Sequence, residues 1–252
     1  MKEIEKYIFI ITYGRTGSTL LMKLLNQIEG ACIRGENGGA LYALFQSYQA
    51  AVMTRKQQGN SKSLSIDHPW YGAAEIRPKR YARALGRVFV REILQPPEGT
   101  RITGFKEIRY PSLSSESLEK FINFLHLAFK GEVYIIFNRR NLEDVSRSSW
   151  WSREDPKKVQ KMLRPMYDWM EKYNARHPKR TFLAEYDQYV QDHSSLRYLF
   201  EFLGETYPED ELKQVFNTRL MHCKRPQEKS SPRAPGKKRE RNQRKSSKSF
   251  SE

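Results

Sequence analysis

Residues 7–19 read YIFIITYGRTGST, and this stretch decides the fold. Its first six residues, Tyr7 to Thr12, are all aromatic or β-branched, which is typical of a strand buried in a parallel sheet. A glycine-containing loop follows directly. Leucine and isoleucine then recur at helical spacing from Leu20 to Ile28, and the run ends at Gly30. The stretch therefore predicts a strand, a tight loop and a helix.

The loop has the composition of an anion-binding turn. Its backbone N–H groups and those of the helix's first turn point to one spot, where the helix dipole favours a phosphate. Gly14 and Gly17 allow close backbone approach or positive φ, and Arg15 adds a positive charge. Ser18 and Thr19 can cap the helix and donate hydroxyls to a phosphate. The GxxxxGK[ST] pattern is absent, so this is not a Walker A loop.

Strand-like and helical segments alternate along the rest of the chain. Strands are predicted at 31–34, 101–108, 132–137 and 181–185, and helices at 41–55, 76–95, 118–129, 142–150, 156–175, 194–203 and 209–216. Residues 57–72 form a polar, breaker-rich loop. This alternation predicts an α/β fold with a mostly parallel sheet flanked by helices.

Composition and charge divide the chain into two parts. The 252 residues include 38% apolar ones, which excludes collagen-like and wholly disordered proteins, and the net charge is +16. Residues 224–252 hold 11 Lys+Arg and 3 Glu, a net +8, with one aromatic residue. We therefore predict a folded domain over residues 1–222 and a disordered basic tail over 223–252. The tail is either a solvated extension or an electrostatic tether to an anionic polymer.

The cysteine count and the apolar runs bear on location. Cys32 and Cys223 are too few for a disulfide framework and favour a reducing compartment. The first apolar run, Ile8 to Ile11, is far shorter than a membrane helix, and no signal peptide is visible. We expect a soluble, cytoplasmic protein.

A second basic motif follows the predicted strand EVYIIF. It reads NRRNLEDVSRS over residues 138–148, with Arg140 and Ser148 eight residues apart. An arginine at the carboxyl end of a strand and a hydroxyl two helical turns later can both face a crevice beside the sheet. An arginine fork binds a phosphate bidentately. Arg139 is the rival for this role, and Arg147 is expected on the surface.

These two motifs together resemble the sulfotransferase family. The first loop resembles its 5′-phosphosulfate loop, with Gly14 where the family carries Pro or Gln, and residues 138–148 resemble its 3′-phosphate motif. Residues 182–190 and 199–204 resemble a late, mainly structural segment, so the likeness covers about residues 7–216. The resemblance implies a P-loop-like sulfotransferase fold and the sulfuryl donor 3′-phosphoadenosine 5′-phosphosulfate (PAPS), with no metal required. It implies donor binding by Gly14, Arg15, Thr16, Gly17, Ser18, Thr19, Arg140 and Ser148.

The same resemblance suggests three catalytic residues. Arg15 stands where the family carries its catalytic cation, and Lys106, at a predicted strand end, resembles a lysine of tyrosylprotein sulfotransferases. Glu36 follows the second strand and resembles the base of the tyrosylprotein and trehalose-type enzymes. His68 is its rival, because cytosolic small-molecule sulfotransferases use a histidine base.

Acceptor contacts are expected from the long polar loop. His68, Trp70 and Tyr71 lie in it, and the two rings either stack on an acceptor or pin the loop. Trp150 and Trp151 are expected to pack. The late RKGxxGDWK motif of the cytosolic branch is absent, which places the chain nearer the carbohydrate, trehalose-type and tyrosylprotein branches and leaves a third 3′-phosphate contact unassigned.

Two other functions compete with sulfuryl transfer. A P-loop-like kinase would use ATP and Mg²⁺, although the GK[ST] signature is missing. A binding module would use the basic tail on nucleic acid or another anionic polymer. The acceptor stays open among sugar, lipid, phenol and protein tyrosine hydroxyls.

Overall fold

The fold is built on five parallel strands. The computed structural model describes residues 4–59 and 65–223. The strands are β1 (Lys6–Thr12), β2 (Ala31–Arg34), β3 (Ile102–Glu107), β4 (Glu132–Arg139) and β5 (Thr181–Glu185). They pair in the order β2-β3-β1-β4-β5, and every pairing is parallel. The predicted α/β class and parallel sheet are confirmed.

Strand β1 is central because its side chains are apolar on both faces. Phe9 and Ile11 enter one hydrophobic cluster, while Ile8 and Ile10 enter the other. All four are at most 1% exposed. Successive side chains of a strand point to opposite faces, so a continuous apolar run requires cover on both sides.

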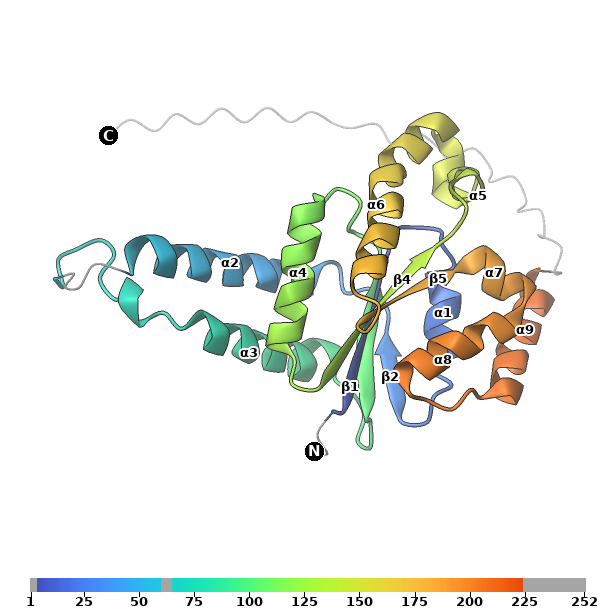
Figure 1. Cartoon of the computed structure of the whole chain (residues 1–252), viewed down its shortest axis with the longest axis horizontal. Coiled ribbons are helices and arrows are strands. Elements are labelled where there is room, and N and C mark those ends of the chain that lie inside the picture. The colour runs from blue at the N-terminus through green and yellow to red at the C-terminus, as the bar shows by residue number, and fades with distance from the viewer. Residues whose placement is uncertain (1–3, 60–64, 224–252) are drawn as a thin grey trace, which may run out of the picture.

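Helices supply that cover (Figure 1). The cluster around Phe9 includes α2 (Ala40–Gln58), α3 (Pro78–Phe89), α4 (Ser115–Ala128) and α6 (Pro156–Arg176). The cluster around Ile8 includes α1 (Ser18–Leu25), α7 (Tyr186–Gln191), α8 (Arg197–Leu203) and α9 (Glu209–Cys223). Short elements complete the chain: η1 (Ala73–Glu75), η2 (Val90–Leu94), α5 (Leu142–Ser146), η3 (Ser149–Arg153) and η4 (His193–Leu196).

Some of the helical predictions differ from the structure. The helix predicted at 76–95 is α3 followed by a π-helical turn, η2. The helix predicted at 142–150 ends at Ser146, because the chain turns there and Ser149 takes a positive φ of 53°. Helix α7 follows β5 directly and was not predicted. Its six residues are too few to show an apolar period.

Helices α2 and α3 form an arm that projects from the body of the molecule (Figure 1). Their far ends are joined by the loop that holds the predicted acceptor residues. None of the described helices is long and apolar enough to cross a membrane. The predicted basic tail lies outside the described residues, apart from Cys223, which ends α9.

Candidate active site at the carboxyl edge of the sheet

A cavity of about 710 Å³ opens where β1, β3 and β4 end. Its walls come from the loop after β1, from α1, from the ends of β3 and β4, and from α9. The lining residues are Gly14, Arg15, Gly17, Ser18, Thr19, Leu20, Lys23, Glu36, Lys106, Ile108, Arg140, Trp150, Tyr186, Val215 and Thr218. This volume lies within the usual range for small-molecule sites.

The loop after β1 leaves the amino end of α1 open to the cavity. Gly17 occupies the N-cap position with φ 78°, and no side chain caps the helix. The sequence-based suggestion that Ser18 and Thr19 cap α1 is therefore wrong, because the helix begins at Ser18 itself. The Gly17 carbonyl accepts from the Leu20 N–H at 2.8 Å. The N–H groups before Leu20 are left without a capping side chain, and they suit an anion.

Both loop glycines are required by neighbouring rings. A Cβ on Gly17 would lie 2.1 Å from ring carbons of Tyr186, and one on Gly14 would lie 2.7 Å from Trp150. Gly17 also needs its positive φ. The loop therefore packs so closely between the Tyr186 and Trp150 rings that neither glycine has room for a side chain.

Thr16 is turned away from the cavity and anchors the loop. Its hydroxyl lies 2.8 Å from that of Thr12, and its carbonyl accepts from Asn138 Nδ2 at 2.9 Å. Asn138 in turn accepts from the Tyr189 hydroxyl at 3.1 Å. This buried network ties the ends of β1 and β4 to α7, so Thr16 positions the loop rather than lining the cavity.

Arg15 reaches across the cavity mouth. It has a left-handed backbone, with φ 72°, and its Nε donates to Ser148 Oγ at 3.2 Å. Its guanidinium lies 5.2 Å from the centre of the Trp150 ring. A strained non-glycine residue at a ligand loop is a common feature of functional sites. The 15-to-148 contact brings the two sequence motifs together.

Arg139 and Arg140 have different surroundings. Arg139 is buried and bonds to Glu185 at 2.5 Å and Glu171 at 3.1 Å, so it serves the packing of β5 and α6. Burial raises the pKa of the Glu185 carboxyl, and the Arg139 contact opposes that rise. Arg140 alone lines the cavity. Of the two rival arginines, Arg140 is therefore the one that lines the cavity.

Arg140 is held in place but retains an unsatisfied donor. Its guanidinium carbon lies 4.7 Å from the centre of the Tyr186 ring. Its Nε lies 3.7 Å from Asp187 Oδ1, which is an ion-pair contact but too long for a hydrogen bond. Its Nε is buried and has no hydrogen-bond partner. The buried Tyr13 hydroxyl donates to the Arg140 carbonyl at 3.0 Å, and burial raises the Tyr13 pKa. An orphaned guanidinium nitrogen at a cavity fits an oxyanion ligand.

Lys106 and Glu36 form an ion pair at the opposite wall. Lys106 is 7% exposed at the end of β3, and its Nζ contacts Glu36 Oε1. The other carboxylate oxygen of Glu36 lies 3.2 Å from Arg109 Nη1. Glu36 does not come from a neighbour of β1, because β3 separates β2 from β1. It reaches the cavity through the loop after β2.

Glu107, which the sequence analysis did not single out, organises that loop. It is completely buried, and its Oε2 accepts from the N–H groups of Asn37 at 3.3 Å and Gly39 at 2.9 Å. Its Oε1 accepts from Arg109 at 2.8 Å. One buried carboxylate therefore fixes the backbone that directly follows Glu36. The sequence offered one signal for the importance of Glu107, which is its position at a strand end directly after the candidate residue Lys106.

With this geometry established, comparison with known proteins identifies the family. A family model described as the sulfotransferase family matches residues 7–209. The chain belongs to the sulfotransferase family. No curated protein matches it.

Solved sulfotransferase structures resemble the chain in fold. A sulfotransferase domain from the olefin synthase of Synechococcus PCC 7002 superposes with a TM-score of 0.54 at 18% identity, covering 84% of this chain and 77% of that one. Sulfotransferase STF9 from Mycobacterium avium gives 0.45 at 14% identity, covering 88% and 69%. Sulfotransferase STF1 from Mycobacterium tuberculosis H37Rv gives 0.43 at 13%, covering 86% and 72%. The first of these supports the sulfotransferase fold.

Not all residues expected from the family resemblance reach the cavity. His68, Trp70 and Tyr71 are exposed and lie in the connection between α2 and η1. Figure 1 shows the described part of this connection at the far end of the arm. The 19-residue helix α2 alone is about 28 Å long, which explains the separation. His68 Nδ1 accepts from the Trp70 N–H at 3.1 Å, a local turn contact. Ser148 contacts Arg15 but does not line the cavity.

Other cavity residues of this sulfotransferase were missed by the sequence analysis. Tyr186 and Trp150 line the cavity, although the tryptophan was expected only to pack, and Lys23 projects from α1. The signal for Tyr186 was its place directly after β5, at the same sheet edge as the other strand ends. Nothing in the sequence predicted that α9 reaches the cavity. Its Val215 and Thr218 form part of the cavity wall.

Within residues 4–59 and 65–223, no group of three or more His, Cys, Asp or Glu side chains is arranged to hold a metal ion.

Proposed function

We propose that this sulfotransferase moves a sulfuryl group from PAPS to an acceptor hydroxyl. The supporting observation is that Arg15, Glu36, Lys106 and Arg140, which come from the ends of four different strands, line one cavity. Cations for the donor and a carboxylate for the acceptor thus stand within a single small-molecule site.

The donor's two ends match two sets of residues. The open N–H groups after Gly17, with Ser18, Thr19 and Arg15, suit the 5′-phosphosulfate. Arg140, with its orphaned Nε, suits the 3′-phosphate. Strands β1 and β4 are adjacent, so one adenosine bisphosphate can span both positions.

Sulfuryl transfer needs charge stabilisation more than covalent chemistry from the protein. The bond between sulfur and the donor's 5′-phosphate oxygen breaks, and a bond between sulfur and the acceptor oxygen forms. The products are a sulfate ester and adenosine 3′,5′-bisphosphate. By analogy with phosphoryl transfer, the transition state is loose, and cations at its oxygens lower the barrier. Arg15 and Lys106 fill this role.

Glu36 accepts the proton of the acceptor hydroxyl. In the structure, Lys106 Nζ contacts Glu36 Oε1. When Lys106 turns to the transferring sulfuryl group, Oε1 becomes free to accept that proton. Arg109 and the Glu107-bound loop keep the carboxylate in place meanwhile. Proton removal by a positioned carboxylate is ordinary general base catalysis.

The resemblance to the tyrosylprotein and trehalose-type branches rests on Glu36 and Lys106, and the resemblance to the carbohydrate branch rests on the absence of the RKGxxGDWK motif. These features do not identify a particular acceptor, so we propose only that the acceptor carries a hydroxyl group. Glu36→Gln should lower the transfer rate to any accepted hydroxyl by about 10²-fold. His68→Ala, a substitution of the rival base at the arm, should leave the rate unchanged. A full rate in Glu36→Gln would remove this residue from the mechanism.

Ligand choice tests the function before an acceptor is known. Thermal unfolding is measured with adenosine 3′,5′-bisphosphate and, separately, with ATP and Mg²⁺. The proposal predicts that the bisphosphate raises the melting temperature and that ATP with Mg²⁺ does so less. Stabilisation by ATP with Mg²⁺ alone would favour the kinase alternative.

A further inference from the structure

Helix α3 carries cations that the proposed active site does not use. Residues 76–91 contain six Lys and Arg and no Asp or Glu. Lys79, Arg83 and Arg87 recur every four residues, so they follow one side of the helix. Together with Arg77 and Arg80, we call these five residues the α3 cation ridge.

The ridge has no internal neutralisation. No ion pair or hydrogen bond to its five charged side chains occurs within the part of the chain that the structure describes, whereas Arg91 just beyond pairs with Glu92 at 2.5 Å. All five are exposed. Like charges four residues apart on a helix repel each other. Such an arrangement suits a partner that brings negative charge.

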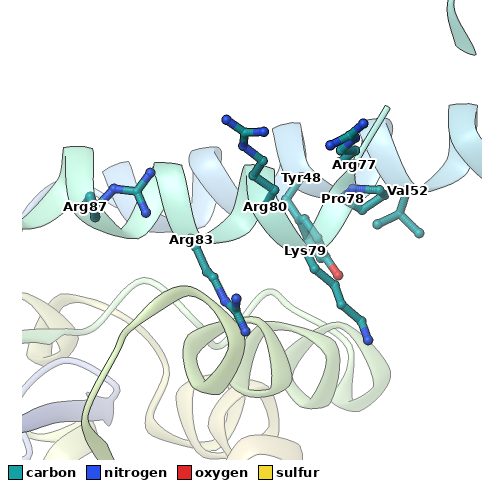
Figure 2. A pocket seen from close by; sticks show the side chains of 8 residues that line it. All are labelled: Tyr48, Val52, Arg77, Pro78, Lys79, Arg80, Arg83 and Arg87. Atoms are coloured by element: carbon teal, nitrogen blue, oxygen red, sulfur yellow. The ribbon is translucent and has the colours of Figure 1, made fainter. Parts of the chain in front are cut away.

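Apolar surface lies between these cations. A hollow of about 850 Å³ between α2 and α3 is lined by the ridge together with Tyr48, Val52 and Pro78 (Figure 2). Figure 2 shows Lys79 and Arg83 extending to one side of α3, and Arg77 and Arg80 to the other.

A second, larger cavity shares two of the same cations. It measures about 1280 Å³, lies at the amino-terminal edge of the sheet, and is lined by Arg83 and Arg87. Its other lining includes Val88 and Phe129, and one acid, Glu98. Two hollows with largely apolar lining therefore adjoin the ridge and share Arg83 and Arg87.

Exposed apolar side chains also gather on the arm. Among the residues that the structure describes, ten large hydrophobic side chains are exposed, and seven of them lie between residues 53 and 93: Met53, Ile66, Trp70, Tyr71, Tyr81, Val88 and, in η2 just after α3, Ile93. Trp70 and Tyr71, 45% and 61% exposed, stand at the far end of the arm. Amphipathic aromatic rings favour the boundary between water and lipid, and arginines bind lipid phosphates.

We propose that the α2–α3 arm docks on an anionic lipid surface. Cations alone would suit any polyanion, and nucleic-acid bases also stack on exposed rings, but a soluble polyanion has no use for the exposed aliphatic side chains and the apolar hollows. A lipid surface uses both, because phosphate headgroups pair with the ridge while the aromatic and aliphatic side chains enter the interfacial layer. This docking is independent of sulfuryl transfer and of the sheet-edge cavity.

Co-sedimentation with vesicles tests the proposal on the full-length chain. The vesicles contain phosphatidylcholine and phosphatidylserine, with pure phosphatidylcholine as the reference. The variant Lys79→Gln/Arg83→Gln/Arg87→Gln should bind the mixed vesicles on the order of 100-fold more weakly than the unsubstituted chain. The control variant Lys158→Gln/Lys161→Gln/Lys172→Gln removes the same charge from exposed positions of α6 and should bind within about twofold of the unsubstituted chain.

A second pair of measurements separates lipid from other anions. Trp70→Ser/Tyr71→Ser should weaken vesicle binding about tenfold and leave binding to soluble dextran sulfate unchanged. Equal losses in the two triple variants would overturn the proposal, since total charge alone would then explain binding. Tighter binding to dextran sulfate than to vesicles, or no effect of the aromatic variant, would also overturn it. Stabilisation by adenosine 3′,5′-bisphosphate, retained in every variant, shows that each folds and that the donor site is separate.

Discussion

The sheet-edge cavity and the α3 cation ridge are both rich in cations, but they hold them differently. In the cavity the three cations assigned to the donor each have a fixed companion: Lys106 has Glu36, Arg140 has Tyr186 and Asp187, and Arg15 has Ser148. On the ridge the cations have none among the described residues. Fixed cations suit a small ligand of defined geometry, whereas unpaired exposed cations suit an extended anionic surface. Charge pairing thus distinguishes a preorganised site from a docking surface.

The largest effect is expected from removing a cavity cation. Lys106→Ala and Arg15→Ala should each slow the conversion of PAPS to adenosine 3′,5′-bisphosphate by about 10²–10³-fold, with water or a hydroxyl as acceptor. Chromatography of the nucleotide products measures the rate. Lys158→Ala, on the exposed face of α6, is the control and should keep its rate. A normal rate in both cavity variants would show that fixed pairing does not mark the catalytic cations.

Substitutions of the two adjacent arginines at the end of β4 should have different effects, one on stability and the other on donor binding. Arg139→Ala leaves the partly buried Glu185 without its cation and should lower the unfolding free energy by about 2 kcal/mol, as measured by urea denaturation. Arg140→Ala should cost little stability and should weaken donor binding instead. If the two variants exchanged these effects, Arg139 would be the donor residue.

This pair also shows what the sequence can and cannot predict. Spacing placed an arginine at the end of β4, but a shift of one residue along a strand reverses the face, and only packing against β5 and α6 decides between the two. Strands of apolar, β-branched residues were predictable from local composition, and so was the loop after β1. The closure of one cavity wall by α9 and the distance of His68 from the site depend on tertiary arrangement, which no local pattern records.

Substitution of a loop glycine tests the contact between the β1 loop and α7. Gly17→Ala adds a Cβ that meets the Tyr186 ring at 2.1 Å on a backbone with φ 78°. We expect a loss of about 2 kcal/mol in unfolding free energy and weaker donor binding. Gly99→Ala is the matched control, since it has φ 83° but open space around the added Cβ, and it should lose only about 1 kcal/mol. Equal losses would mean that the ring contact is unimportant.

The smallest effect concerns a histidine far from the active site. Burial and the nearby Arg180 and His177 lower the pKa of His126 from 6.5 to about 4. The unfolded chain therefore binds a proton that the folded chain does not, and stability should fall as the pH drops from about 6.5 to 4. His126→Gln should reduce this acid dependence by on the order of 1 kcal/mol, since the group is partly solvated. An unchanged profile of unfolding free energy against pH would contradict the assignment, and His68→Gln serves as the exposed control.

The central claim is that the ends of β1 and β4 bind the two phosphates of one nucleotide. Isothermal titration of adenosine 3′,5′-bisphosphate and of adenosine 5′-monophosphate, on the unsubstituted chain and on Arg140→Ala, tests it most directly. The account predicts that the unsubstituted chain prefers the bisphosphate and that Arg140→Ala loses this preference while still binding the 5′-monophosphate. A preference that persists in Arg140→Ala, or no preference in the unsubstituted chain, would contradict it.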